Sequence, residues 1–219
     1  MTNHGTIGLG VLAFVVTGAA ANVFMMASSA NSARSLTYAS FKSEPEAAKG
    51  SAAFRERELY TPQMVVNGSQ EFVGSDFSTA KSAIKKALAQ AASVEVAVGA
   101  KEFSQETPVK AGGKRAAKRI VVTSSLKNVL RGAVARIALT ESGLSTDVKR
   151  GENSGRALKH DAVVRAFMSI KNPVDGETVT ELTPPDGFDV TKARVVVFVQ
   201  DGSSMKVFGA SESEVSRDR

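Results

Sequence analysis

Lys159-His160-Asp161 places a histidine next to a carboxylate, which is the pair that a general base requires. On a β-strand, neighbouring residues point to opposite faces, so Asp161 would not orient the imidazole of His160. No GxSxG nucleophile elbow accompanies the pair. Other carboxylates, such as Glu56, Glu58, Glu141 and Glu152, are dispersed along the chain and form no recognisable acid–base pair. We therefore expect a hydrogen-bonded structural histidine and no catalytic residues.

The chain of 219 residues contains no cysteine and only two histidines, His4 and His160. The missing cysteines exclude disulfides, thiolate nucleophiles and cysteine-ligated metal sites. Two histidines alone are too few for a classical zinc site. We expect neither a metal nor a cofactor.

A run of basic residues is the main candidate for a contact surface. Positions 110 to 136 hold eight basic residues and no acidic one: Lys110, Lys114, Arg115, Lys118, Arg119, Lys127, Arg131 and Arg136. Such a run could bind anionic lipid headgroups, nucleic acid or an acidic protein surface. It contains no aromatic residue on which bases could stack, so nucleic acid is disfavoured. The candidates are therefore a partner protein, anionic lipid, or a solvated strand face without a partner.

The polar segment Lys149 to Arg156, KRGENSGR, could also hold an anion. It lacks the GxxxxGK[ST] arrangement of a phosphate-binding loop and opens no helix. We expect a structural hairpin loop there.

The first thirty residues predict a membrane segment. Ile7 to Met26 is an uncharged stretch of twenty residues, which as a helix is ~30 Å long and would cross a bilayer. We expect a single-pass anchor in a bacterial inner membrane, residues 1–30, with the globular part in the periplasm. A cleaved secretory signal is the alternative, because Ser28-Ser29-Ala30 offers a small-residue cleavage pattern. Residues 31–53 are predicted to be a linker and residues 211–219 a frayed tail.

Residues 54–93 predict a β-β-α unit. Asn67-Gly68 is a strong turn dipeptide between two short apolar runs, Met64 to Val66 and Glu71 to Val73. Ser75 or Asp76 can cap a following helix. Its apolar stripe is expected at Phe77, Ala80, Ile84, Leu88 and Ala91.

Residues 94–210 predict only strands. Short apolar runs such as Ile120 to Val122 and Arg194 to Val199 alternate with turn residues such as Gly112-Gly113 and Asp201-Gly202. This spacing is typical of an antiparallel β-sandwich, with a hairpin at Asp201-Gly202. The predicted fold class is α+β, with a transmembrane helix, the β-β-α unit and the sandwich in that order.

Two segments carry a resemblance to a known family. YTPQMVVNGSQEFVGSD, Tyr60 to Asp76, and STDVKRGENSGRALKHDAVVRAF, Ser145 to Phe167, resemble the bacterial secreted family called domain of unknown function 1223. The resemblance covers roughly Phe54 to Ala210 and implies a thioredoxin-like half followed by a β-rich domain. Members usually begin with a strand, a CxxC-type turn and a helix. No cysteine and no strand pattern occurs here between the membrane segment and Phe54.

The resemblance also has an implication for redox chemistry, which concerns the Thr61-Pro62 pair. Thr61-Pro62 matches the position of a proline that would face the family's cysteines, so the two residues are expected to be a degenerate redox-site remnant. Half of a thioredoxin unit would leave an open sheet edge and an apolar surface, which something must cover.

The sequence predicts a protein that acts by binding. We expect a non-catalytic, membrane-anchored accessory or structural subunit of a bacterial membrane protein complex, which acts by protein–protein binding. The first alternative is a cleaved, secreted periplasmic protein that binds a small molecule or a lipid. The second is an unrecognised enzyme.

Overall fold

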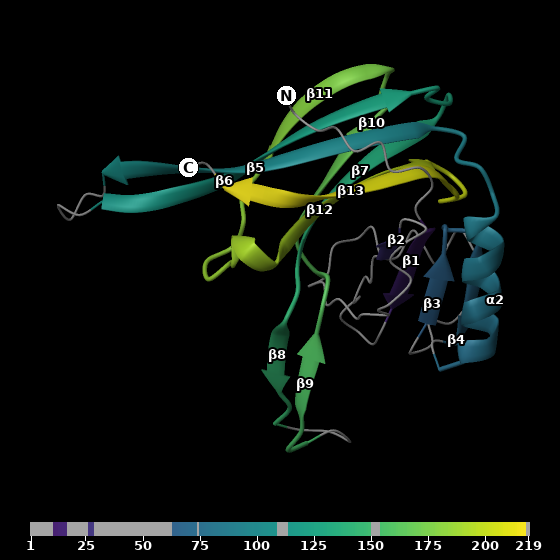
Figure 1. Ribbon diagram of the computed structural model, residues 1–219, viewed down its shortest axis with the longest axis horizontal. Coiled ribbons are helices and arrows are strands. Elements are labelled where there is room, and N and C mark those ends of the chain that lie inside the picture. The colour runs from purple at the N-terminus through teal and green to yellow at the C-terminus, as the bar shows by residue number, and fades with distance from the viewer. Residues whose placement is uncertain are drawn as a thin grey trace.

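The computed structural model describes residues 11–16, 26–28, 63–73, 75–108, 114–149 and 154–217. These residues form a small sheet with one helix, a large curled sheet and a projecting hairpin (Figure 1). Strands dominate the described residues, and α2 is the one α-helix among them. The predicted α+β class with a transmembrane helix and a sandwich is therefore wrong, for reasons given below.

The small sheet has the order β2-β1-β3-β4, with antiparallel neighbours throughout. Its elements are β1 (Val11–Val16), β2 (Met26–Ser28), β3 (Gln63–Val66), β4 (Gln70–Val73) and the helix α2 (Phe77–Leu88). The predicted β-β-α order of β3, β4 and α2 is confirmed. It belongs to a four-stranded sheet, because β1 pairs along β3 and covers the edge that was expected to be open.

The predicted transmembrane helix is wrong at the residues that the structure describes. β1 and β2 both lie in the expected membrane segment, where Ala13 pairs with Val66 of β3. Within the described ranges, no helix has the length and apolar character needed to cross a membrane. A short apolar run such as VLAFVV suits a central strand as well as a helix, and periodicity cannot separate the two. The predicted linker at 31–53, where no strand pattern was expected, lies outside the described residues.

The β3–β4 turn joins the small sheet to the large one. Asn67 and Gly68 have φ values of 49° and 63°, a left-handed conformation that suits Asn and Gly, within the three-residue loop between the paired residues Val66 and Gln70. A Cβ at position 68 would lie 1.9 Å from the carbonyl oxygen of Met205, so glycine is needed for contact as well as for the turn. The Val207 amide donates to the Asn67 carbonyl at 2.9 Å.

The helix α2 begins where predicted, and Ala80, Ile84 and Leu88 of the predicted stripe belong to the cluster packed against the sheet, whereas Phe77 and Ala91 are exposed. The Asp76 carboxylate accepts hydrogen bonds from the backbone amide and hydroxyl of Thr79, and these bonds lower the pKa of Asp76. Ala80, Ala83 and Ala87 face the sheet, whereas Phe77 is 72% exposed. Alanines let the helix backbone approach the strands closely, so the small residues rather than the phenylalanine define the contact.

The large sheet has the order β10-β7-β12-β13-β5-β6-β11. Its strands are β5 (Glu95–Pro108), β6 (Lys114–Lys127), β7 (Ala133–Glu141), β10 (Val163–Lys171), β11 (Gly176–Leu182), β12 (Ala193–Asp201) and β13 (Val207–Arg217). β8 (Leu144–Asp147) and β9 (Ala157–His160) form a separate hairpin that projects from the sheet (Figure 1), and the 3₁₀-helix η1 (Val190–Lys192) precedes β12.

The predicted sandwich is instead one curled sheet. Two antiparallel groups, β10-β7-β12-β13 and β5-β6-β11, are joined by parallel pairing of β13 with β5, as between Val215 and Ala100. Sandwiches and curled sheets share the same alternating strand pattern, so the pattern could not separate them. β13 also extends to Arg217, so most of the predicted frayed tail is strand. The predicted hairpin at Asp201-Gly202 is confirmed by the antiparallel β12–β13 pair.

The main core lies inside the curl. Its buried residues alternate along the strands, among them Ile120, Val122 and Leu126 of β6, and Val195, Val197 and Val199 of β12. Burial of one such side chain stabilises the fold by about 1.5–3 kcal/mol. A second buried cluster on the other face includes Val196 and Phe198, so β12 is buried on both sides. This explains why its sequence, RVVVFV, is almost continuously apolar.

Candidate protein-binding surface

The distal half of the β5–β6 pair forms a ribbon that extends beyond the sheet (Figure 1). β6 pairs with β5 over its whole length, whereas β11 accompanies β6 only from Ile120 to Leu126. The described pairing of β13 with β5 ends where Arg217 lies opposite Glu102. We call residues 103–108 and 114–119 the basic ribbon. Among the described residues, no third strand pairs with it.

The basic run does not form one surface. Lys110 lies outside the described residues. Lys114 and Arg115 are placed by their backbone, opposite Pro108 and Thr107 in the basic ribbon. The other members of the run are Lys118 and Arg119 at the base of the ribbon, Lys127 at the end of β6, Arg131 in the turn before β7, and Arg136 within β7.

Arg136 lies in the protein interior. Its side chain is 6% exposed, its guanidinium lies 5.9 Å from the ring of Phe167, and it donates to the hydroxyl of Ser169. β7 is covered on both faces, so a basic residue there cannot reach solvent as one on β6 does. Arg136 is therefore no part of an exposed contact surface.

Three cations of β6 have described side chains, and each pairs with a glutamate on a neighbouring strand. Lys118 Nζ lies 3.0 Å from Glu102 Oε1, and Lys127 Nζ lies 3.8 Å from Glu95 Oε2, both on β5. Arg119 Nη1 lies 3.1 Å from Glu181 Oε2 on β11. The pairs of Arg119 and Lys127 are exposed and add only about 0–1 kcal/mol to stability, whereas Glu102 is buried. These ion pairs show that the strands on both sides of β6 place glutamates beside its basic residues.

Phe103 exposes an aromatic ring at the base of the basic ribbon. The ring is 36% exposed, Lys101 Nζ lies 5.2 Å from its centroid, and Arg119 is its direct cross-strand neighbour. Aromatic residues and arginine are enriched at protein interfaces.

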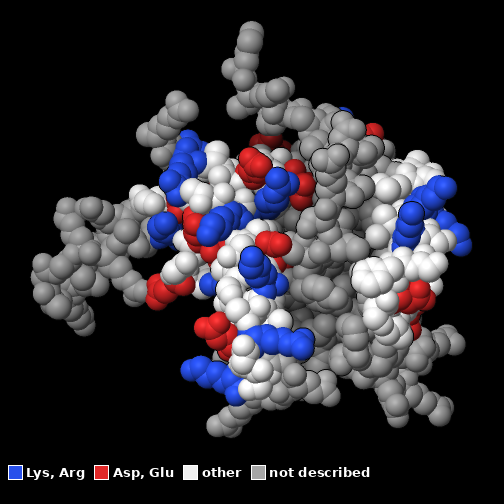
Figure 2. All heavy atoms as spheres, turned by 60° about the horizontal axis from the view of Figure 1, so that its bottom comes forward, with Lys and Arg blue, Asp and Glu red and all other residues white. Residues whose placement is uncertain are grey.

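Figure 2 shows that the charges on the visible face alternate in sign. Blue and red side chains are interleaved over the large sheet, without a continuous basic field. A separate group of lysines lies over α2, where Lys81, Lys85 and Lys86 are exposed. The basic ribbon is therefore distinguished by its projection and open edges rather than by the charge of the whole face.

The β8–β9 hairpin contains the second candidate loop. The Val148 amide donates to the carbonyl of Arg156 at 2.9 Å, and the Gly155 amide donates to the carbonyl of Val148 at 2.8 Å. The Ser154 hydroxyl donates to the Lys149 carbonyl at 3.2 Å. These backbone bonds agree with the predicted hairpin loop, whose residues 150–153 lie outside the described part of the chain.

His160 and Asp161 have separate structural roles. His160 ends β9 opposite Leu144 of β8. Asp161 accepts a hydrogen bond from the Gly143 amide at 2.8 Å, which fixes the base of the hairpin. The carboxylate is thus occupied by the backbone of the preceding loop.

A buried ion pair that was not predicted from the sequence lies next to this hairpin. Glu141 is 3% exposed, and its Oε2 lies 3.4 Å from Nε of Arg165. Its Oε1 accepts a hydrogen bond from the Asp189 amide at 3.0 Å, which holds the segment before η1 against the sheet. A charged residue that ends the apolar run of β7 was the available signal. No group of three or more metal-ligating side chains occurs among the described residues.

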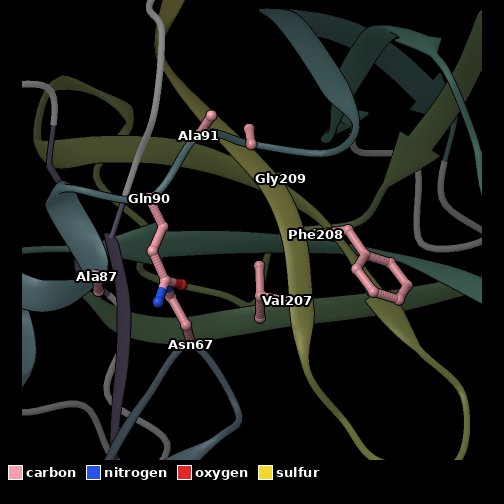
Figure 3. A pocket seen from close by; sticks show the side chains of 8 residues that line it. Asn67, Ala87, Gln90, Ala91, Val207, Phe208 and Gly209 are labelled. Atoms are coloured by element: carbon pink, nitrogen blue, oxygen red, sulfur yellow. The ribbon is translucent and has the colours of Figure 1, made fainter.

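A small crevice lies between α2 and the start of β13. It encloses about 30 Å³, room for one or two water molecules. Figure 3 shows Gln90 extending from the end of α2 towards Asn67, with Val207 and Phe208 on the β13 side. The crevice suits hydration of the junction between the sheets. Thr61 and Pro62, the predicted redox remnant, lie outside the described residues.

Two solved structures are similar to this chain at low sequence identity. A crystal structure of an Agrobacterium tumefaciens protein shares 15% identity at a TM-score of 0.48, over 78% of this chain and 70% of that one. HBP35 of Porphyromonas gingivalis shares 15% identity at a TM-score of 0.47, over 78% of this chain and 58% of that one. No curated protein matches the sequence.

The family comparison is more direct. The family model described as "Protein of unknown function (DUF1223)" matches residues 37–200, which is more than half of the chain. The match begins inside the predicted linker and covers both segments on which the resemblance was based. The chain therefore belongs to the DUF1223 family of proteins of unknown function.

Proposed function

We propose that this protein is a non-catalytic accessory protein that acts by binding another protein through the basic ribbon. The observation that carries the proposal is the ribbon itself, two paired strands that continue past the last neighbour on each side. A two-stranded hairpin alone is marginally stable in water, so such a ribbon gains stability when a partner packs against it.

The charge of the ribbon supports a protein contact of acidic character. Residues 103–108 and 114–119 contain four basic residues and one acidic residue, so their formal charge is 4 − 1 = +3, against +6 for the whole chain. Complementary charge speeds the encounter of two proteins and selects between partners. The expected location in a bacterial membrane complex, with the globular part in the periplasm, stays a prediction.

Native purification with matched variants tests the proposal. We expect a stoichiometric partner to co-purify with the unmodified chain in mild detergent. The triple substitution Lys110→Gln, Lys114→Gln and Arg115→Gln should reduce its recovery at least tenfold. The control Lys81→Gln, Lys85→Gln and Lys86→Gln removes the same charge from α2 and should leave recovery unchanged.

Two results would contradict this function. One is a monodisperse monomer without a partner for the unmodified chain. The other is equal recovery of the partner with both triple variants, since binding would then not involve the ribbon.

A further inference from the structure

We infer that the open edge of β6 in the basic ribbon, residues 114–119, accepts an extended acidic segment of a partner protein as an added antiparallel strand. This inference rests on the proposed function and names the chemistry and geometry of its partner. Three features of the molecule support the inference: the strand register, the residues that end β11, and the ion pairs already formed along β6.

The edge is open because β11 stops early. β11 runs along β6 until Leu182 pairs with Ile120. Thr183-Pro184-Pro185 follows, and proline has no amide to donate to a strand ladder. Phe188 and Val190 then enter the main core, which draws the chain away from β6. The backbone of residues 114–119 is left with β5 on one side and no strand among the described residues on the other.

The register of β6 favours acidic residues on an added strand. Successive strand residues alternate between faces, so positions 115 and 119 share one face and positions 114 and 118 share the other. On the existing neighbours, Arg119 pairs with Glu181 of β11 and Lys118 pairs with Glu102 of β5. An added strand that continues the line of β11 would meet cations on both of its faces, and opposite charges on paired strands are stabilising.

An acidic protein segment fits this edge better than nucleic acid or anionic lipid does. Unpaired backbone donors and acceptors in a row are satisfied by another extended chain, which is the basis of strand addition. Nucleic acid and lipid headgroups would contact the charges alone and would leave the backbone donors and acceptors of this edge without partners. Charged residues on an edge also prevent self-association, so the test must separate binding from simple protection of the edge.

A defined peptide makes the test independent of the natural partner. The probe is a fluorescent decapeptide of alternating Glu and Thr, measured by anisotropy against the full chain. We expect saturable binding that weakens with added salt. Methylation of the two central backbone nitrogens of the peptide should weaken binding at least tenfold, because it removes one donor on each edge without changing the charge.

Variants of the protein locate the site. Lys114→Gln with Arg115→Gln should weaken peptide binding at least tenfold, whereas the matched control Lys81→Gln with Lys85→Gln should not. Equal binding of the methylated peptide, or of a Lys-Thr peptide, would overturn strand addition by an acidic segment. Self-association of the ribbon variant with unchanged peptide binding would also overturn it, because the cations would then only protect the edge.

The same binding measurement can also be made with nucleic acid and with anionic lipid. Binding of an oligonucleotide or of phosphatidylglycerol vesicles that requires Lys114 and Arg115, without binding of the peptide, would overturn the inference. If the natural partner co-purifies through the ribbon but no acidic peptide binds, the proposed function survives and this inference fails. If no partner depends on the ribbon, the proposed function fails first.

Discussion

Charged side chains in this protein differ most in how deeply they are buried. Arg194 lies between two carboxylates, with its guanidinium 2.7 Å from Glu212 and 2.9 Å from Glu214. Glu212 is half-buried, and burial raises the pKa of its carboxyl group above the usual range although Arg194 acts in the opposite direction. The side chain of Glu214 is 80% exposed. The same arginine therefore holds one buried and one solvated carboxylate.

The raised pKa of Glu212 predicts a pH dependence of stability. The folded state holds the proton of this carboxyl more tightly than the unfolded state does. The free energy of unfolding should therefore fall as the pH rises from the usual pKa of a glutamate to the raised pKa in the fold. Glu212→Gln cannot titrate and should flatten the profile in that window, measured by urea unfolding between pH 4 and pH 7.

Glu214→Gln is the matched control, because it removes the exposed carboxylate from the same arginine. It should retain most of the slope of the unmodified protein. A steeper profile for Glu212→Gln than for the unmodified chain would contradict the expected sign.

Among the elements, the β3–β4 hairpin has a turn that both reverses the chain and contacts the large sheet. Asn67-Gly68 predicts the turn from sequence alone, since two residues with positive φ suit Asn and Gly. The same turn also packs against the start of β13. Gly68 lies close to the carbonyl of Met205, and the amide of Val207 donates a hydrogen bond to the carbonyl of Asn67. Nothing in the turn sequence indicates this second contact.

Gly68→Ala should separate the two roles. The substitution places a Cβ 1.9 Å from the Met205 carbonyl oxygen and also strains φ, so we expect a loss of about 2 kcal/mol or more in the free energy of unfolding. Gly132→Ala is the control, since φ there is +78° and no atom lies within 4 Å of the added Cβ. It should cost only about 1 kcal/mol. Equal losses in urea unfolding would show that the junction contact contributes nothing.

The whole molecule depends on the strand that joins its two antiparallel groups. β13 pairs with β12 on one side and with β5 on the other, over residues that looked like a polar tail. Val215 is buried in the main core and Ala210 in the cluster on the other face, while the alternating Ser and Glu residues between them give the segment its polar composition. Within the described part of the chain, no other strand pair joins the two groups of the curled sheet.

Truncation tests this role of β13. Deletion of residues 211–219 should abolish cooperative thermal unfolding, because it removes the pairs with Arg194 to Val197 of β12 and with Ala100 to Glu102 of β5. Deletion of residues 218–219 alone should leave the unfolding transition unchanged. A nine-residue deletion that unfolds at the temperature of the full chain would restore the interpretation of this segment as a frayed tail.

Local chemistry in the sequence was enough to predict the β3–β4 hairpin, the cap of α2 at Asp76 and several of the strands, and the resemblance of two segments predicted the family. Turn dipeptides, caps and alternation act over a few residues and are read directly from the chain. The candidate site was found only in part, because the run from Lys110 to Arg136 crosses two strands with different surroundings. Lys118 and Arg119 reach solvent on β6, whereas Arg136 is enclosed on β7.

Only the tertiary structure decided which apolar runs are strands, how the sheet closes and where the ribbon stands free. The run in β1 became a strand because β3 lies beside it, and the two antiparallel groups became one sheet because Val215 meets Ala100 far away in the chain. Such pairings bring together residues that do not influence each other locally. The sequence by itself determined the segments and their charges, and long-range pairing determined which of those charges stand at an open edge.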